Sequence, residues 1–239
     1  MQAGLDIGNT RSKLGLFHSN GDIEIIYLER NADALSAAVG DYHITDLIVT
    51  SVVDELIEDE ALIQKLDSFI WLSHVTPLPI ELSYDTPETL GRDRIATAVG
   101  ASVLFPKSHS LVIDSGTCMT VDFVRDGKIF EGGYIAPGIR MRWLAMHDYT
   151  ARLPLVKDMP EWRLFGKTTS EALGVGGFGS LVFELEGFIY RIKEEYKELN
   201  VILTGGDGTF IFENIVHKIH LQPNLLMEGL REIQRYNAR

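Results

Sequence analysis

The sequence predicts an α/β fold made of two similar lobes, each a mixed sheet flanked by helices. The first observation is a pair of matching segments, 5–17 and 111–124. In each, an apolar strand ends at an Asp-x-Gly turn with hydroxyl residues, and a second strand follows. The second observation is that strand-like and helix-like stretches alternate through both halves of the chain. Self-similarity at about half the chain length indicates internal duplication, because a solenoid repeat would be much shorter.

Length and charge restrict the class of protein. With 239 residues, 45% hydrophobic and 23% charged, the chain can bury the cores of two lobes. A formal net charge of −12 argues against a basic surface for nucleic acid or an anionic membrane. No continuous run reaches the about 18 apolar residues of a membrane span, and the first strand begins too near Met1 for a signal segment. Because Cys118 is the single cysteine, no intrachain disulfide can form, and we expect a cytoplasmic protein.

The first lobe is predicted to span 1–75, with the element order βββαβαβ. Its elements are the strand–turn–strand segment 5–17, a strand at 23–28, a helix from Asn31 or Asp33 to about Val39, a strand at 46–52, a helix at 54–66 and a strand at 69–72.

A connecting segment is predicted at 76–108 and a second lobe at 109–239. Prolines make 76–90 non-helical, and a helix follows from about Asp93. The second lobe begins with strands at 110–114, 119–124 and 128–135, the last two joined by a two-residue hairpin turn at Asp126-Gly127. It continues with a helix from Gly138 to about Met146, an irregular segment at 151–166, a helix at 169–196, a strand at 201–203, a turn at 205–208 into a short helix, a strand at 218–221 and a helix at 225–236.

The turn of the first segment has the residue types that bind a phosphate chain. Gly8 allows close backbone approach, hydroxyl and amide side chains donate hydrogen bonds, and Lys13 adds a cation. Asp6 could hold a hydrated metal ion against those phosphates. A plain Gly-Asn hairpin turn would explain the same residues. The second copy, with Gly116, favours one nucleotide held in a cleft between the two turns.

Other motifs have a functional and a structural interpretation. Residues 91–94, Gly-Arg-Asp-Arg, lie at a predicted helix start. In the functional interpretation they supply a general base and an arginine that binds a carboxylate; in the structural one they are charged residues on a solvent-exposed helix start. Residues 132–138 could form a wall of the nucleotide cleft or a tight connection between a strand and a helix. Residues 204–208 could contact adenine or ribose, or form a plain loop. The G-x-G-x-x-G of 174–179 follows no strand, so it predicts close helix packing. Residues 166–168 lack the remainder of a P-loop, and His217 with His220 lacks further zinc ligands.

Together these residues resemble the type III pantothenate kinase family, within the acetate kinase, sugar kinase, Hsp70 and actin superfamily. The resemblance implies actin-like, ribonuclease H-like lobes. The motifs that carry it are Asp6-Ile7-Gly8-Asn9-Thr10 with Lys13, Tyr84 and Pro87 before Gly91-x-Asp93-Arg94, Asp114-x-Gly116-Thr117 with Thr120 and Asp122, Gly132-Gly133-x-Ile135-x-Pro137-Gly138, Thr169, and Thr204-Gly205-Gly206.

The same resemblance implies a role for each site residue. ATP would be bound by Asp6, Ile7, Gly8, Asn9, Thr10, Arg11, Ser12, Lys13 and Thr117, with Mg²⁺ held by Asp6 through water. Pantothenate would be bound by Tyr84, Gly91, Arg92, Asp93, Arg94 and Thr169. Asp93 would be the general base and Asp114 would hold K⁺ or NH₄⁺. The family also implies a homodimer in which Thr169 completes the pocket of the partner.

The expected activity is ATP-dependent phosphorylation of the primary hydroxyl of pantothenate to 4′-phosphopantothenate, the first step of coenzyme A synthesis. A sugar or acetate kinase of the same superfamily and a non-catalytic nucleotide-gated regulator are the alternatives. The chain departs from the family where Arg92 replaces a small residue and Cys118 replaces a common alanine. Arg92 could crowd the pocket.

Overall fold

The computed structural model describes residues 1–8, 12–29, 31–51 and 63–238. The chain divides into two compact units. Unit 1 comprises Met1–Lys107, Val124–Gly132 and Asn224–Arg239, and unit 2 comprises Ser108–Phe123 and Gly133–Pro223. Residues far apart in the sequence therefore share unit 1.

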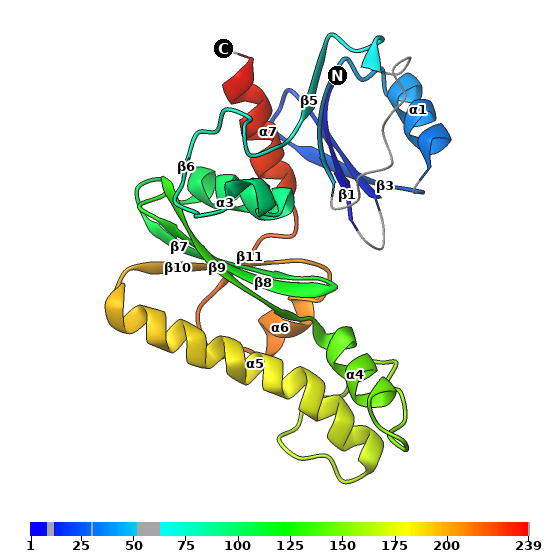
Figure 1. Ribbon diagram of the computed structural model, residues 1–239, viewed down its shortest axis with the longest axis vertical. Helices are drawn as coiled ribbons and strands as arrows, with labels where there is room; N and C mark the ends of the chain where they lie inside the picture. The colour runs from blue at the N-terminus through cyan, green and yellow to red at the C-terminus, as the bar shows by residue number, and fades with distance from the viewer. Residues whose placement is uncertain (9–11, 30, 52–62, 239) are drawn as a thin grey trace. The chain divides into compact units, whose positions relative to one another are not determined.

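Unit 1 contains a mixed five-stranded sheet in the order β3-β2-β1-β4-β5 (Figure 1). Its strands are β1 (Gln2–Ile7), β2 (Ser12–Phe17), β3 (Ile23–Leu28), β4 (Asp46–Ser51) and β5 (Ser68–Trp71). The first three form an antiparallel meander, and β4 and β5 continue it in parallel. The predicted meander and the strand at 69–72 are thus confirmed, as is the strand at 46–52 up to Ser51. The last residue of that strand and most of the helix predicted at 54–66 lie outside the described residues.

Helices cover both faces of this sheet. Helix α1 (Ala32–Asp41), whose N-cap Asn31 accepts from the Ala34 N–H, packs Leu35, Ala38 and Val39 against the odd-numbered residues of β1. Successive side chains of a strand point to opposite faces, and the other face meets α7 (Leu225–Asn237), where Leu230 lies against Gly4. Helix α7 also packs on α3 (Arg92–Leu104).

The second sheet repeats the plan of the first. Its order is β11-β10-β7-β8-β9-β6, so β7 to β11 occupy the places of β1 to β5. The strands are β6 (Glu81–Leu82), β7 (His109–Ser115), β8 (Cys118–Arg125), β9 (Ile129–Pro137), β10 (Leu199–Thr204) and β11 (His220–Leu221).

The duplication extends to register. Asp6 is paired with Thr50 on the parallel neighbour of β1, and Asp114 is paired with Thr204 on the parallel neighbour of β7. Equivalent strands therefore end in equivalent carboxylates, as the matching motifs predicted.

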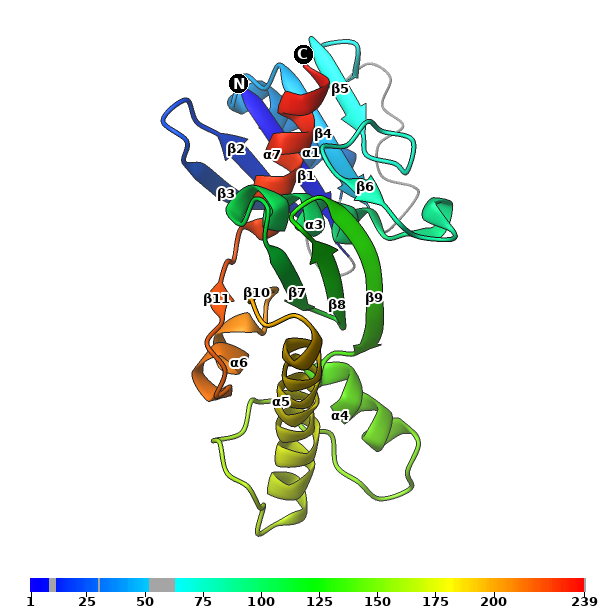
Figure 2. The same ribbon diagram turned by 90° about the vertical axis from the view of Figure 1, so that its left-hand side faces the viewer.

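Unit 2 has its own core, which its strands form with three helices. These helices are α4 (Ile139–Asp148), α5 (Thr169–Glu195) and α6 (Gly208–Asn214) (Figure 2). Phe178, Leu181 and Leu185 of α5 pack with apolar residues of β7, β8 and β10. Among the described helices, α5 alone is long and apolar enough to cross a membrane by length and composition. Half of that apolar stretch is buried inside the protein, which is typical of a core helix.

Local differences from the predicted elements are small. The segment predicted as non-helical at 76–90 contains the short strand β6 and a single 3-10 turn at Pro87–Thr89. The hairpin turn predicted at Asp126-Gly127 is confirmed, because both residues have positive φ, 54° and 60°, as a type I′ turn requires.

Candidate active site

The β1–β2 turn is held by a regular ladder up to its last described residues. Asp6 is opposite Lys13 and Ile7 is opposite Ser12 in the antiparallel register. This pairing places a carboxylate, a hydroxyl and an ammonium side chain at one end of the hairpin, with Gly8 just beyond. The remaining residues assigned to this turn, Asn9, Thr10 and Arg11, lie outside the described residues.

The start of α3 presents Asp93 in its first turn. Gly91 is the N-cap, with no side chain, and a Cβ there would lie 2.5 Å from Asp93 Oδ1. Asp93 Oδ1 also accepts from the Arg94 N–H at 2.9 Å. The glycine therefore leaves room for a half-buried carboxylate that is oriented by backbone at a helix N-terminus.

The two arginines beside Asp93 have different surroundings. Arg92 donates from Nη1 to the Ser51 carbonyl at 3.3 Å, which turns its guanidinium toward the end of β4. Arg94 is buried, with only 5% of its surface exposed. Its guanidinium carbon lies 5.9 Å from the centre of the Tyr84 ring and 5.6 Å from that of Phe130.

Tyr84, Arg94 and Phe130 form an aromatic-lined cationic site within unit 1. The two rings are 5.9 Å apart, and a Cβ on Gly132 would touch Tyr84 at 3.7 Å. A guanidinium over aromatic faces is held in a fixed orientation and retains its charge. Such a group suits a carboxylate ligand. Phe130 was missed by the sequence analysis, because an apolar residue within a strand carries no signal of a site.

The β7–β8 turn is enclosed by a second backbone segment. Gly116 N donates to Cys118 O at 3.0 Å, which closes the turn, and Gly138 N donates to Thr117 O at 3.2 Å. A Cβ on Gly138 would lie 2.6 Å from Thr117 O and still closer to Gly116 O, whereas a Cβ on Gly116 itself would meet nothing within 3.7 Å. The turn is therefore tightly packed at Gly138, whereas a side chain at Gly116 would make only ordinary contacts.

The loop after β10 lies against the same turn. Asp207 N donates to Ser115 O at 3.1 Å, and Gly205, with φ of +93°, has Asp114 Oδ1 where a Cβ would stand. Burial raises the pKa of Asp207, and the Arg140 guanidinium partly opposes this shift. Unit 2 thus brings together Asp114, Gly116, Thr117 and Gly205.

Thr169 lies at the first position of α5 with its side chain exposed. The preceding Thr168 is the N-cap and accepts from the Glu171 N–H at 3.2 Å, while Glu171 accepts from the Lys167 N–H at 2.7 Å. The hydrogen bond from Lys167 lowers the pKa of Glu171. Residues 166–168 therefore cap a helix, consistent with the rejection of a P-loop there.

Of the glycines of 174–179, Gly174 and Gly177 pack closely, as predicted, whereas a Cβ on Gly176 would meet no atom within 4 Å. A Cβ on Gly174 would meet the ring of Pro160 at 3.2 Å, and one on Gly177 would overlap the Trp143 indole. Trp143 is buried and donates from Nε1 to Leu173 O at 3.1 Å. These residues join α4 to α5.

The repeated sheets, with Asp6 and Asp114 near the ends of equivalent strands, define an α/β protein with an actin-like fold. Solved structures agree with this fold. A Baf family transcriptional activator from Campylobacter jejuni has a TM-score of 0.66 at 21% identity, covering 99% of this chain and 98% of that one. An inorganic polyphosphate/ATP-glucomannokinase from an Arthrobacter species has a TM-score of 0.51 at 14% identity, covering 99% of this chain and 98% of that one.

Sequence comparison identifies the family. A family model described as type III pantothenate kinase matches residues 4–191. A type III pantothenate kinase of Bacteroides fragilis is 38% identical over 238 residues, which cover 98% of this chain and 97% of that protein. The chain belongs to the type III pantothenate kinase family.

Proposed function

We propose that this protein transfers the γ-phosphoryl group of ATP to the primary hydroxyl of pantothenate, giving 4′-phosphopantothenate and ADP in the cytoplasm. The family supports this reaction. The observation that carries it is the start of α3, where Asp93 precedes the buried Arg94, which lies over Tyr84 and Phe130. That arrangement supplies a base for a hydroxyl and, one residue away, a cation for a carboxylate. Pantothenate contains both groups.

In this proposal Asp93 acts on the acceptor. The hydroxyl oxygen of pantothenate attacks the γ-phosphorus, the bond from phosphorus to the ADP oxygen breaks, and the hydroxyl proton passes to the Asp93 carboxylate. The transition state of phosphoryl transfer is loose, so alignment contributes more than the strength of the base. Gly91, Arg92, Arg94 and Tyr84 bind and orient pantothenate, with Arg94 facing its carboxylate.

ATP is assigned to residues 6–13 and Thr117. The backbone at Gly116, where a Cβ would meet no atom closer than 3.7 Å, leaves room for a phosphate group beside the turn. Lys13 and Ser12 supply a cation and a hydroxyl beside Asp6.

The donor types fit the ions that the family implies. Among the described residues, no group of three or more His, Cys, Asp or Glu gathers to hold a metal, and Mg²⁺ needs none, since one carboxylate, waters and substrate phosphates suffice. Asp6 would hold Mg²⁺ through water. Asp114, whose carboxylate lies beside backbone carbonyls, would hold K⁺ or NH₄⁺. Both ions supply positive charge that neutralises phosphate oxygens.

We also assign a homodimer in which Thr169 completes the partner's pantothenate pocket. Its exposed position at the start of α5 is compatible with that role. Mixing Asp93→Asn and Thr169→Ala protomers, both poorly active alone, tests it. Half of the mixed dimers would pair unlike protomers, each with one intact pocket, so activity should return to about a quarter of the wild-type value. No gain over the separate variants would contradict a shared pocket.

Asp93→Asn tests the chemistry. We expect turnover to fall by a factor of about 10² or more while the Kd for ATP stays within twofold, since Asp93 acts on the acceptor hydroxyl. Asp33→Asn is the matched control, because Asp33 also lies in the first turn of a unit 1 helix but in α1. Full turnover in Asp93→Asn would exclude this residue as the base. Wild-type protein that binds ATP but releases no ADP with pantothenate would favour a nucleotide-gated regulator.

A further inference from the structure

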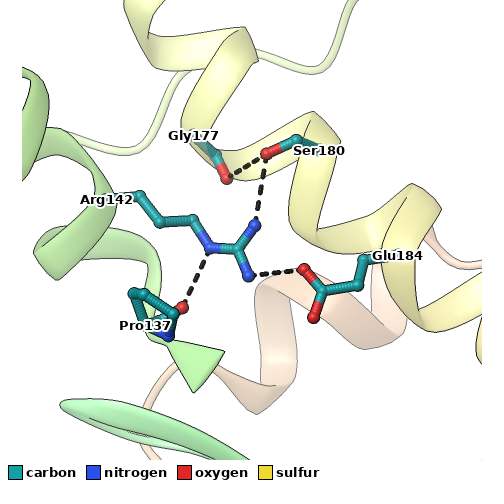
Figure 3. Close-up of polar contacts among 5 residues, drawn as sticks. All are labelled: Pro137, Arg142, Gly177, Ser180 and Glu184. Carbon is teal, nitrogen blue, oxygen red and sulfur yellow. Dashed lines mark hydrogen bonds and ion pairs between the residues drawn. The ribbon is translucent and has the colours of Figure 1, made fainter. Parts of the chain in front are cut away.

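Arg142 links three separate parts of unit 2 through one guanidinium (Figure 3). From α4, its Nε donates to the Pro137 carbonyl at 2.9 Å, and its Nη2 pairs with Glu184 Oε2 of α5 at 2.6 Å. Its Nη1 donates to Ser180 Oγ at 3.4 Å, and that hydroxyl donates to the Gly177 carbonyl at 3.3 Å. The side chain of Arg142 is only 17% exposed, which limits screening of the ion pair by water.

The carbonyl that Arg142 binds belongs to the segment enclosing the second phosphate turn. Pro137 directly precedes Gly138, which donates to Thr117 O and whose Cα packs against the carbonyls of Gly116 and Thr117. The chain of contacts therefore runs from α5 through Arg142 and Pro137 to the β7–β8 turn. Each link is a hydrogen bond or a backbone contact too close for a side chain.

The surroundings of Glu184 strengthen its pairing with Arg142. The hydroxyl of Tyr134 on β9 is buried, and burial together with the negative charge of Glu184 raises the pKa of Tyr134. A tyrosine is neutral at physiological pH in any case, so Arg142 is the cation that pairs with the Glu184 carboxylate. A pair with reduced access to water is stronger than one on an open surface.

We propose that Arg142 and Glu184 are positioning residues for the Gly116–Thr117 turn and thereby set the affinity of the enzyme for ATP phosphates. Neither residue touches the substrate in this account, and both act through Pro137 and Gly138. The inference rests on the function proposed above, in which Thr117 contacts a phosphate. It adds that the turn is held by the several N–H donors of the planar Arg142 guanidinium, and not by its positive charge alone.

Arg142→Lys separates the fork from the charge. A lysine can still pair with Glu184 but lacks the fixed set of donors that reaches Pro137 O and Glu184 together. We expect the KM for ATP to rise about tenfold, below the roughly 10²-fold that a 1 Å misplacement of a reacting group can cost. The KM for pantothenate should stay within twofold, because Tyr84 and Arg94 belong to unit 1, and Thr169, although on α5, lies eleven residues before Ser180.

Glu184→Gln provides the second variant and Glu186→Gln its matched control. Glu186 lies on the same helix and also accepts a hydrogen bond. Its donor is the Val216 N–H at 3.0 Å, and Val216 is far from Pro137 in the sequence. We expect Glu184→Gln to weaken binding of a non-hydrolysable ATP analogue several-fold, and Glu186→Gln to leave it within twofold of wild type. Melting temperatures of all variants are measured alongside, so that loss of folding is recognised.

The outcomes distinguish this inference from the proposed function. The positioning role would be overturned if folded Arg142→Lys had an unchanged KM for ATP. It would also be overturned if the KM values for ATP and for pantothenate rose equally. Equal binding of the analogue by Glu184→Gln and Glu186→Gln would do the same. Wild-type protein that fails to bind the analogue would instead contradict the proposed function, and the inference would fall with it.

Discussion

Replacing Gly138 with alanine perturbs the proposed ATP site through a single added methyl group. The backbone of Gly138, with φ of −67° and ψ of 173°, is open to alanine, so any effect comes from packing. The new Cβ would lie 2.6 Å from Thr117 O, where ordinary contact begins at 3.4 Å, and closer still to Gly116 O. Both neighbours are backbone atoms, so the turn itself must move by about 1 Å. A shift of that size can reduce catalysis about 10²-fold, while overpacking typically costs about 1–3 kcal/mol of stability.

Steady-state kinetics with varied ATP and a thermal melt measure the two effects of Gly138→Ala. We expect the KM for ATP to rise by at least tenfold and the melting temperature to fall by about 2–4 °C for each kcal/mol lost. Gly176→Ala is the control, because a Cβ there meets no atom within 4 Å and the helix gains from alanine. A Gly138→Ala enzyme with wild-type KM for ATP would refute the assignment of the turn to phosphate binding.

Two further predictions concern stability. Gly229→Ala should lower the free energy of unfolding by about 1–3 kcal/mol, because the added Cβ would overlap the Ala96 carbonyl. Gly187→Ala should raise the free energy of unfolding by about 0.5–1 kcal/mol, because a Cβ there meets no atom within 4 Å. Urea titrations measure both. Since burial raises the pKa of Asp207, its carboxyl stabilises the fold when protonated and loses that contribution as pH rises. Asp207→Asn should therefore raise the melting temperature at pH 7 and have less effect near pH 4; an equal effect at both would contradict this.

The elements and their order followed from the sequence because local patterns determine them. The duplicated Asp-x-Gly hairpins predicted two sheets of one plan, and the structure has the same strand order in both, with Asp6 and Asp114 at matching register positions. Turn chemistry was equally readable. Asp126-Gly127 adopts the positive φ values that its residue types favour, and Asn31 caps α1.

Contacts between distant segments could not be read in this way. Nothing in the pattern of α7 states that Leu230 packs on Gly4, because an apolar stripe identifies a buried face without identifying what buries it. The same holds for the site. The position of Asp93 and Arg94 at a helix start was readable from the sequence, whereas Phe130 contacts Arg94 and Arg142 pairs with Glu184, partners many residues away in the chain.

Whether this protein phosphorylates pantothenate is decided by the release of ADP in a coupled assay, with pantothenate present or absent and K⁺ present or replaced by Na⁺. We expect ADP to form only when pantothenate is supplied, and K⁺ to be needed for the full rate. ADP release that ignores pantothenate, or that follows a sugar or acetate instead, would contradict it.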